Sequence, residues 1–429
     1  MTRRLLLLSL LAYGLIFLGM AALQGVLVAL AIPLVLYMGA ALTFGPGSLH
    51  LRATRTLSAK RVASQAPVEV RVVVANEGPQ LEELLLEDSL LPGLQILQGK
   101  TSLLTSLSPG ETAELTYTVR GGRGSYTFSG LHAMASDPLG LFRRRMLLTA
   151  PAHLLVLPDY TRLRPVPIRP RRTHAFTGSI PSRQGGSGVS FFGVREYRLG
   201  DSLHHINWRV TARHDEDLFT NEFERERIAD VGLILDARMQ TDVPSPKGGL
   251  FEYAVYAAAS LADAFLRNGN RVGLLIYGRG RETTFPGYGK IQRERILHAL
   301  AAARTGDNMA LEHLDYLPTR FFPARSQIVL ISSLIPDDLP VLVRLRANGY
   351  QVLAISPDPV SFEAGLIEEN PELAPQSALR LATRIARLER ALLLRKLQRV
   401  GIRVVDWQVD FPLDRVIHAA LGKTPPAPV

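Results

Sequence analysis

A run of 45 residues without an acidic or basic side chain, Leu5–Leu49, most strongly constrains how this chain can fold. As one continuous helix it would measure about 68 Å at roughly 1.5 Å per residue, whereas the hydrocarbon core of a bilayer is about 30 Å thick. The run therefore fits two antiparallel spans better than one. Gln24 and Gly25 interrupt it near its middle, which predicts a transmembrane hairpin over residues 1–48 with helices at 5–23 and 26–44.

The basic residues that flank this run predict its orientation. Arg3 and Arg4 precede the first span, and the connector between the spans carries no charge. The cations that follow the second span are Arg52, Arg55, Lys60 and Arg61. Because positive flanks stay on the cytoplasmic side, we expect a multi-pass protein of the prokaryotic cytoplasmic membrane with both termini in the cytoplasm. The alternative is a cleaved signal peptide ending near Ala21, which would leave the second span as a stop-transfer segment.

Residues 49–158 show the alternation of apolar and polar side chains that is typical of half-buried strands. The clearest strand is Val68–Val74, and turn signals such as Pro109-Gly110 separate the strands. Further strands are expected at Leu81–Asp88, Leu94–Leu97 and Ala113–Val119. Several short strands at this spacing predict a small β-sandwich of immunoglobulin-like type.

Residues 159–229 are expected to form a basic linker and a motif segment. Between Tyr160 and Arg195 the linker has seven arginines and no acidic residue, in a chain of net charge +10. Its prolines favour an extended backbone, and the glycine-rich stretch Gln184–Gly188 loosens it. A solvated linker and contact with anionic lipid headgroups remain open. No series of aromatic residues interleaves the arginines, so no nucleic-acid partner is expected.

Residues 230–422 alternate apolar strands with helices, which predicts an α/β domain of Rossmann type with a parallel sheet covered on both faces. The strand Val231–Asp236 is apolar until it ends on a carboxylate. Ligands of such sheets bind at the carboxyl ends of the strands, where Asp236 lies. A Pro-rich tail follows at residues 423–429, and the absence of cysteine excludes thiol catalysis and cysteine-based metal sites.

A long helix expected at about residues 374–399 has two faces. Its basic stripe consists of Arg380, Arg384, Arg387 and Arg390. Its apolar stripe consists of Leu381, Ile385, Leu388 and Leu392. This helical spacing predicts a surface helix whose apolar face packs on the sheet, with docking of an acidic partner as the alternative.

The segment that precedes the α/β domain carries a specific motif. It reads Phe-Gly-Val-Arg-Glu-Tyr-Arg-Leu-Gly-Asp over Phe192–Asp201 and continues to Arg213 with Ile-Asn-Trp and a Thr-Ala-Arg end. This motif resembles the signature of the domain-of-unknown-function 58 family of bacterial and archaeal proteins, as does the upstream segment Asp137–Phe142. The sequence departs from that pattern at His204, His205 and Asn207. The resemblance implies a membrane-anchored protein with a von Willebrand factor A-like domain at residues 230–422.

The motif residues are expected to fix how this segment docks on the sheet domain. They are Arg195, Glu196, Tyr197, Gly200, Asp201, Trp208 and Arg213. We expect Trp208 to be buried at that junction within a charge network. Alternatively, Glu196 and Asp201 are an acid/base pair of an enzyme. A zinc site at His204, His205 and His214 is a further alternative, although their spacing is unusual.

A metal site is expected to be degenerate. The von Willebrand A resemblance implies a divalent cation bound through Asp-x-Ser-x-Ser and a later acid. The matching positions are Asp236, Arg238 and Gln240, so both hydroxyl ligands are replaced. The later acid would fall near Ser332-Ser333 and is absent there. We therefore expect neither a bound metal nor another cofactor.

Together these patterns predict a membrane-anchored, cytoplasm-facing interaction or scaffold protein without catalysis. The family resemblance implies a partner, a MoxR-type AAA+ ATPase, and a role in protein assembly, maturation or cell-envelope processes. The anchor itself implies contact with membrane lipids. An enzyme that uses Glu196 and Asp201 remains an alternative, as does a membrane-tethered binder of anionic lipid or nucleic acid.

Overall fold

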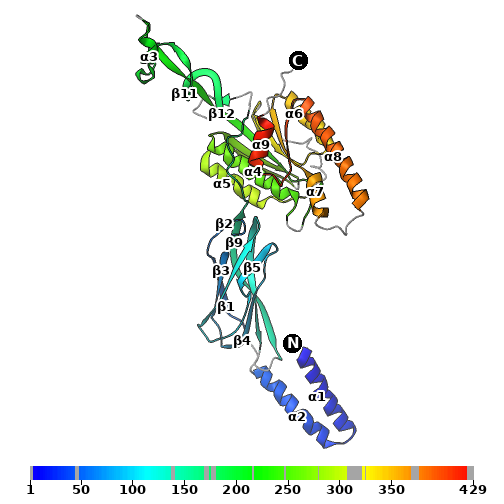
Figure 1. Ribbon diagram of the computed structural model, residues 1–429. Coiled ribbons are helices and arrows are strands. Elements are labelled where there is room, and N and C mark those ends of the chain that lie inside the picture. The colour runs from blue at the N-terminus through cyan, green and yellow to red at the C-terminus, as the bar shows by residue number, and fades with distance from the viewer. Residues whose placement is uncertain are drawn as a thin grey trace. The chain divides into compact units, whose positions relative to one another are not determined.

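The computed structural model describes residues 3–43, 48–136, 141–168, 173–174, 180–214, 217–245, 248–278, 280–306, 321–323, 325–368 and 376–422 (Figure 1). The chain divides into two compact units, Met1–Leu157 and Pro158–Val429. The tail at 423–429 and most of the upstream segment Asp137–Phe142 lie outside the described residues.

Two apolar helices begin unit 1. Helix α1 (Arg3–Ala21) and helix α2 (Gly25–Thr43) are joined by a short turn and lie side by side (Figure 1). A Cβ at Gly19 would come within 2.7 Å of the Val28 side chain, so glycine allows the close approach there. Among the described residues, Arg4–Ala21 is long and apolar enough to cross a membrane, and Gly25–Ala41 is apolar but shorter. The apolar N-terminal helices expected from the sequence are present, shifted by one or two residues.

The rest of unit 1 consists of two sheets around one hydrophobic core. The first sheet has the order β1 (Leu51–Leu57), β3 (Val68–Asn76), β7 (Thr112–Gly121) and β5 (Leu94–Gly99). The second has the order β2 (Arg61–Ala63), β9 (Arg143–Leu157), β8 (Gly124–Ser136), β4 (Leu81–Asp88) and β6 (Ser102–Leu107). In β3, the valines at 68, 70, 72 and 74 are buried and the intervening side chains are more exposed, because successive side chains alternate between faces.

Arg55 is not a membrane-flanking charge. It lies on β1 with a fully buried side chain, and its guanidinium donates to Asp88 on β4 of the opposite sheet at 2.6 Å. The sequence places Arg55 among the cations that follow the second span, but its burial in the pair with Asp88 removes it from that set. Arg52 and Lys60 remain on the surface.

Unit 2 is built on a parallel sheet with one antiparallel edge. The order is β14 (Arg281–Gly287), β13 (Arg271–Tyr277), β12 (Phe219–Asp236), β15 (Gln327–Ile331), β16 (Gln351–Pro357) and β17 (Arg403–Trp407), and β14 is antiparallel to β13. Numbered along the chain this is 3-2-1-4-5-6, the doubly wound order. Short helices and turns connect the strands, as the alternating pattern predicts.

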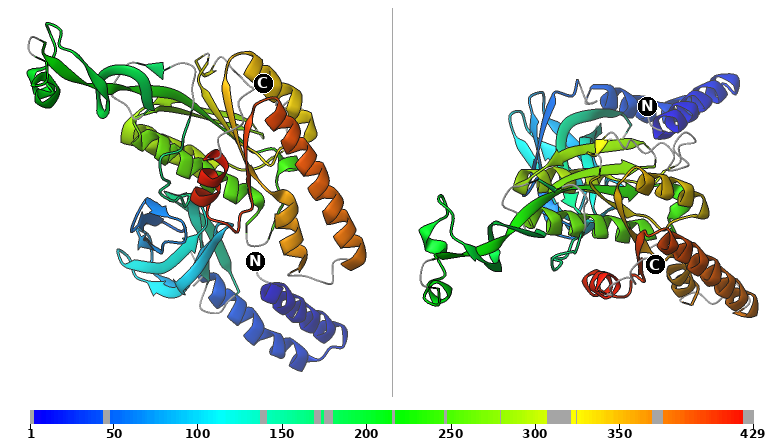
Figure 2. Two further views of the ribbon diagram at one scale, coloured as in Figure 1. Left: turned by 45° about the horizontal axis from the view of Figure 1, so that its top comes forward. Right: turned by 90° about the horizontal axis from the view of Figure 1, so that it is seen from above.

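Helices bury both faces of this sheet (Figure 2). The helices are α4 (Leu250–Arg267), α5 (Gly289–Ala302), α6 (Leu339–Ala347), α7 (Pro359–Glu368), α8 (Gln376–Arg399) and α9 (Leu413–Leu421). Ile234, Leu275 and Leu330 pack in one cluster with residues of α6 and α8. Their neighbours in the strands, such as Leu233 and Val329, point to the opposite face and are also buried.

A long two-stranded ribbon replaces much of the expected linker. Strand β11 (Ile180–Glu196) pairs antiparallel with the first half of β12, and β12 then continues into the sheet (Figure 1). The pairing shifts register around Gly185 and Gly186, so the glycine-rich stretch forms irregularities within a strand instead of a loose linker. At the far end the short helix α3 (Trp208–Thr211) closes the ribbon. Residues 169–172, with three of the linker arginines, lie outside the described residues.

The apolar stripe of α8 does not pack on the sheet. Leu381, Ile385, Leu388 and Leu392 are exposed, whereas Leu394 and Leu397 are buried in the core. The helix therefore docks through a different face from the one that the sequence predicts. Arg390, assigned to a surface stripe, is buried.

Candidate functional site

The carboxyl end of β12 carries a buried ionic cluster. Arg238, two residues beyond the strand, donates from Nε to Asp236 Oδ1 at 2.9 Å and from Nη2 to Asp236 Oδ2 at 2.7 Å. Its Nη2 also donates to Asp338 Oδ2 at 3.0 Å. The side chains of Arg238, Asp236 and Asp338 are 3%, 0% and 2% exposed. One guanidinium thus joins two buried carboxylates from different loops.

Hydrogen bonds from neighbouring loops complete this cluster. Ser332, just after β15, donates its hydroxyl to Asp236 Oδ2 at 2.6 Å, and Ser333 donates to the Thr241 carbonyl at 2.6 Å. Burial alone would lower the pKa of Arg238, but the hydrogen bonds and charges of Asp236 and Asp338 outweigh it and raise that pKa. Burial raises the pKa of Asp338, and Arg238 opposes that rise. Arg238 is therefore held charged.

This donor set does not fit a divalent cation. A cation at Asp236 would need the carboxylate oxygens that already accept from Arg238 and Ser332, and it would lie beside a fixed positive charge. The sequence predicts no acidic residue near Ser332-Ser333. In the structure, however, Asp338, six residues after Ser332, contributes a carboxylate to this cluster. In the described part of the chain, no group of three His, Asp or Glu side chains is placed to hold a metal.

A second buried arginine, Arg390 of α8, lies at the same edge of the sheet. It donates to the carbonyls of Ser333 at 2.9 Å and Ser356 at 3.2 Å, where β15 and β16 end. It also pairs with Asp406 at 2.7 Å and Asp358 at 3.2 Å. The place where doubly wound sheets bind ligands is thus filled by two arginine side chains of the chain itself. No sequence pattern indicates this role, because Arg390 continues the surface spacing of Arg380, Arg384 and Arg387.

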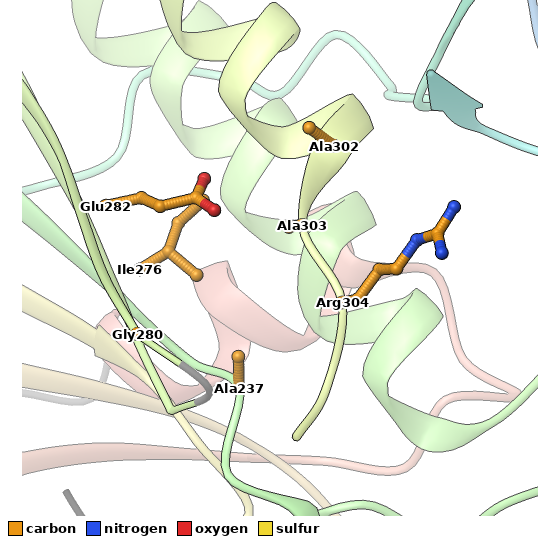
Figure 3. A pocket seen from close by; sticks show the side chains of 7 residues that line it. All are labelled: Ala237, Ile276, Gly280, Glu282, Ala302, Ala303 and Arg304. Atoms are coloured by element: carbon orange, nitrogen blue, oxygen red, sulfur yellow. The ribbon is translucent and has the colours of Figure 1, made fainter. Parts of the chain in front are cut away.

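A pocket of about 310 Å³ lies next to this edge (Figure 3). Its described lining includes Ala237 after β12, Ile276 of β13 and small residues at the end of α5. Glu282 and Arg304 stand on opposite sides of it (Figure 3). These described lining residues offer one carboxylate and one guanidinium, but no hydroxyl, imidazole or amine side chain.

The motif residues form a rigid turn at the end of the ribbon. Arg195 binds Asp201 through two hydrogen bonds of 2.8 Å, and Tyr197 donates to the Asp201 carbonyl at 3.2 Å. Gly200 has a φ of +106°, which favours glycine in this turn. The Arg195 guanidinium and then the Arg198 backbone N–H lower the pKa of Asp201 from 3.8 to about 2. The pairing therefore stabilises the folded turn above pH 3.8, and that contribution is lost as the pH falls through about 2.

The other motif residues do not gather around Trp208. Trp208 is 67% exposed, so the expectation that it is buried against the sheet domain is wrong. It begins α3, which lies at the far end of the ribbon (Figure 1). Arg213 is exposed, and the backbone carbonyl of Glu196 accepts from Arg195 at 2.9 Å. His204 and His205 lie in a 3₁₀ turn.

A comparison with protein families supports the resemblance stated from the motif. The family model described as "Protein of unknown function DUF58" matches residues 193–361, from β11 into α7. This match covers both the ribbon turn and the ionic cluster at Asp236, and it supports the DUF58 family. A comparison with curated proteins gives no match.

Solved structures resemble only parts of the chain. A FixG-related protein from Vibrio parahaemolyticus is 15% identical and has a TM-score of 0.17, over 24% of this chain and 95% of that chain. The cupredoxin domain of amoB from Nitrosocaldus yellowstonii is 10% identical with a TM-score of 0.18, over 25% of this chain and 88% of that chain. TM-scores this low do not indicate a shared fold.

Proposed function

We propose that this chain is a membrane-anchored interaction protein without catalytic activity. In this proposal α1 and α2 form a transmembrane hairpin, the two sheets of unit 1 are an immunoglobulin-like sandwich, and unit 2 is a von Willebrand factor A-like domain that faces the cytoplasm. The doubly wound order with an antiparallel edge strand supports the last assignment. The buried Arg238 and Arg390 fill the edge at which such sheets bind small ligands, which argues against a substrate site there and supports an interaction role through another surface.

The observation that carries the interaction role is the exposed end of the ribbon. Leu199 is fully exposed in the turn that Arg195 and Asp201 hold, and Trp208 and Leu203 are also exposed. Exposed aromatic and aliphatic side chains on a preorganised turn are typical of binding surfaces, where tryptophan is often a hot spot. The family resemblance names the partner that we propose, a MoxR-type AAA+ ATPase acting in protein assembly, maturation or cell-envelope processes.

The enzyme alternative has less support from the geometry. A general base needs a pKa near the working pH, whereas Arg195 holds the pKa of Asp201 at about 2. The paired Asp201 is thus suited to shape the turn. The interpretation of the linker as a binder of anionic lipid or nucleic acid depends on arginines that lie partly outside the described residues.

We expect Trp208→Ser in the full-length protein to weaken capture of the proposed MoxR-type ATPase partner by at least about 30-fold, the effect of losing one hot-spot residue. Trp208→Phe keeps an aromatic ring and should retain most of the binding. Pull-down in detergent with a dilution series of the ATPase measures both. Equal capture by all three proteins would show that the ribbon end is not the contact.

The proposed topology predicts that a reporter fused after residue 422 is cytoplasmic and that one inserted at Leu23, in the turn between α1 and α2, is external. Arg3, Arg4, Arg52 and Lys60 supply the positive flanks of this hairpin. Paired alkaline phosphatase and fluorescent-protein fusions measure the side of each position. A C-terminal fusion active outside the cytoplasm would overturn the topology.

A further inference from the structure

Helix α8 presents an apolar stripe on its outer side. Leu381, Ile385, Leu388 and Leu392 are between 48 and 62% exposed. Their spacing of four, three and four residues places them within roughly 60° around the helix at 100° per residue, over a length of about 16 Å. Four large aliphatic side chains thus form one continuous strip.

The buried side of α8 holds the apolar strip on the surface of unit 2. Arg390, Leu394 and Leu397 are buried, and Arg390 is tied to the ends of β15 and β16 by hydrogen bonds. These residues lie roughly 180° from the strip, so the helix cannot turn the strip inward without breaking the Arg390 contacts. In the views of Figures 1 and 2, α8 lies at the outside of unit 2, with no other described element of that unit over its outer side.

Cations border the strip. Arg384, Arg395 and Lys396 lie within roughly 70° of its middle, and Glu389 is the acidic side chain in the same arc. Arg380 and Arg387 lie further back on the exposed surface. An apolar face bordered by Arg and Lys, on a helix of low overall hydrophobicity, is typical of helices that lie in a bilayer interface.

We propose that α8 rests on the surface of an anionic phospholipid bilayer, with the strip in the interface and the bordering cations on lipid phosphates. A second copy docked through the same strip would bring Arg384 and Arg395 close to the same cations of its neighbour, which opposes self-association. Lipid phosphates instead complement that charge. The inference uses the proposed membrane anchor for one purpose, which is to keep unit 2 near the bilayer. A tethered unit meets the bilayer surface at a high effective concentration.

The test uses the full-length protein in vesicles of phosphatidylcholine with and without 30% phosphatidylglycerol, a composition that sets the anionic surface charge. The chain has no native cysteine, so Leu388→Cys can carry a single environment-sensitive fluorophore. Lys290→Cys, exposed on α5, is the matched control. We expect quenching by lipid-borne spin labels to be at least about threefold stronger at Leu388 than at Lys290, and only in anionic vesicles.

Charge reversal supplies the second measurement. Arg384→Glu with Arg395→Glu, in the Leu388→Cys background, should lower the ratio of bilayer-bound to free label by roughly 25-fold or more, since each cation near an anionic surface contributes about fivefold. Both sites are exposed, so the fold should tolerate the changes. Circular dichroism and the tryptophan emission test whether the fold is retained.

Flotation separates this inference from the anchor. If the protein floats with the vesicles but the Leu388 label stays in water, α8 does not bind lipid and the inference alone is wrong. If the label is shielded only when copies of the chain or the partner ATPase are added, the strip is a protein-docking surface and the inference is likewise wrong. If the protein does not float even with anionic vesicles, both the anchor and the inference are wrong.

Discussion

Replacing Arg238 by alanine is expected to cost unit 2 about 3–5 kcal/mol of stability, the range for removing one partner of a buried ion pair. The physical reason is the charge that remains. Asp236 and Asp338 are both buried, and without the guanidinium two carboxylates face each other with little compensation. Ser332 still donates to Asp236, but a hydroxyl does not neutralise a charge.

Tryptophan fluorescence during urea unfolding of the full-length protein in detergent measures this loss. Both tryptophans of the chain, Trp208 and Trp407, lie in unit 2 and report on it selectively. Arg164→Ala is the control, because its pair with Asp414 is on the surface and should contribute about 0–1 kcal/mol. Asp236→Asn combined with Arg238→Met removes both charges of the closest pair and should cost less than Arg238→Ala alone. If Arg238→Ala behaved like Arg164→Ala, the cluster would not be a buried ionic unit.

The parts that the sequence predicts well are those encoded by local pattern. The continuously apolar segment Val231–Asp236 forms the second half of β12, and the alternating segment Val68–Val74 lies in β3. A continuous apolar run indicates burial on both faces, and strict alternation indicates burial on one face. The ribbon was missed because the stretch Gln184–Gly188 has turn-like composition, although pairing with β12 makes it strand.

The contacts of the candidate site that join distant parts of the sequence cannot be predicted from local pattern. Asp236 and Arg238 are two residues apart, so their pairing is local in the sequence. Asp338 is 100 residues from Arg238, and only the adjacency of β12 and β15 brings them together. Trp208 illustrates the opposite error. A large aromatic in a motif is usually buried, but α3 lies at the end of a ribbon that no described sheet strand covers.

In unit 1, Asp88→Ala is expected to cost about 3–5 kcal/mol for the same reason, a buried charge left without its partner. Arg55 and Asp88 are 0% and 1% exposed and join the two sheets of the sandwich. Asp88 also accepts from the Tyr117 hydroxyl at 2.7 Å, and the Arg55 guanidinium lies 4.8 Å from the centre of the Phe128 ring. Burial and then the Asp88 carboxylate raise the pKa of Tyr117, so the phenol stays protonated and keeps donating.

Hydrogen exchange measured by mass spectrometry on the full-length protein locates this effect. Asp88→Ala should speed exchange in β1, β4 and β7, while the tryptophan-detected unfolding of unit 2 should stay unchanged, because both tryptophans belong to the other unit. Tyr117→Phe is the matched control. It removes one hydrogen bond to the carboxylate but keeps the charge pair, so its cost should be about 1.5–3 kcal/mol. Equal exchange in Asp88→Ala and Tyr117→Phe would mean that the Arg55–Asp88 pair adds nothing beyond the hydrogen bond that Tyr117 donates to Asp88.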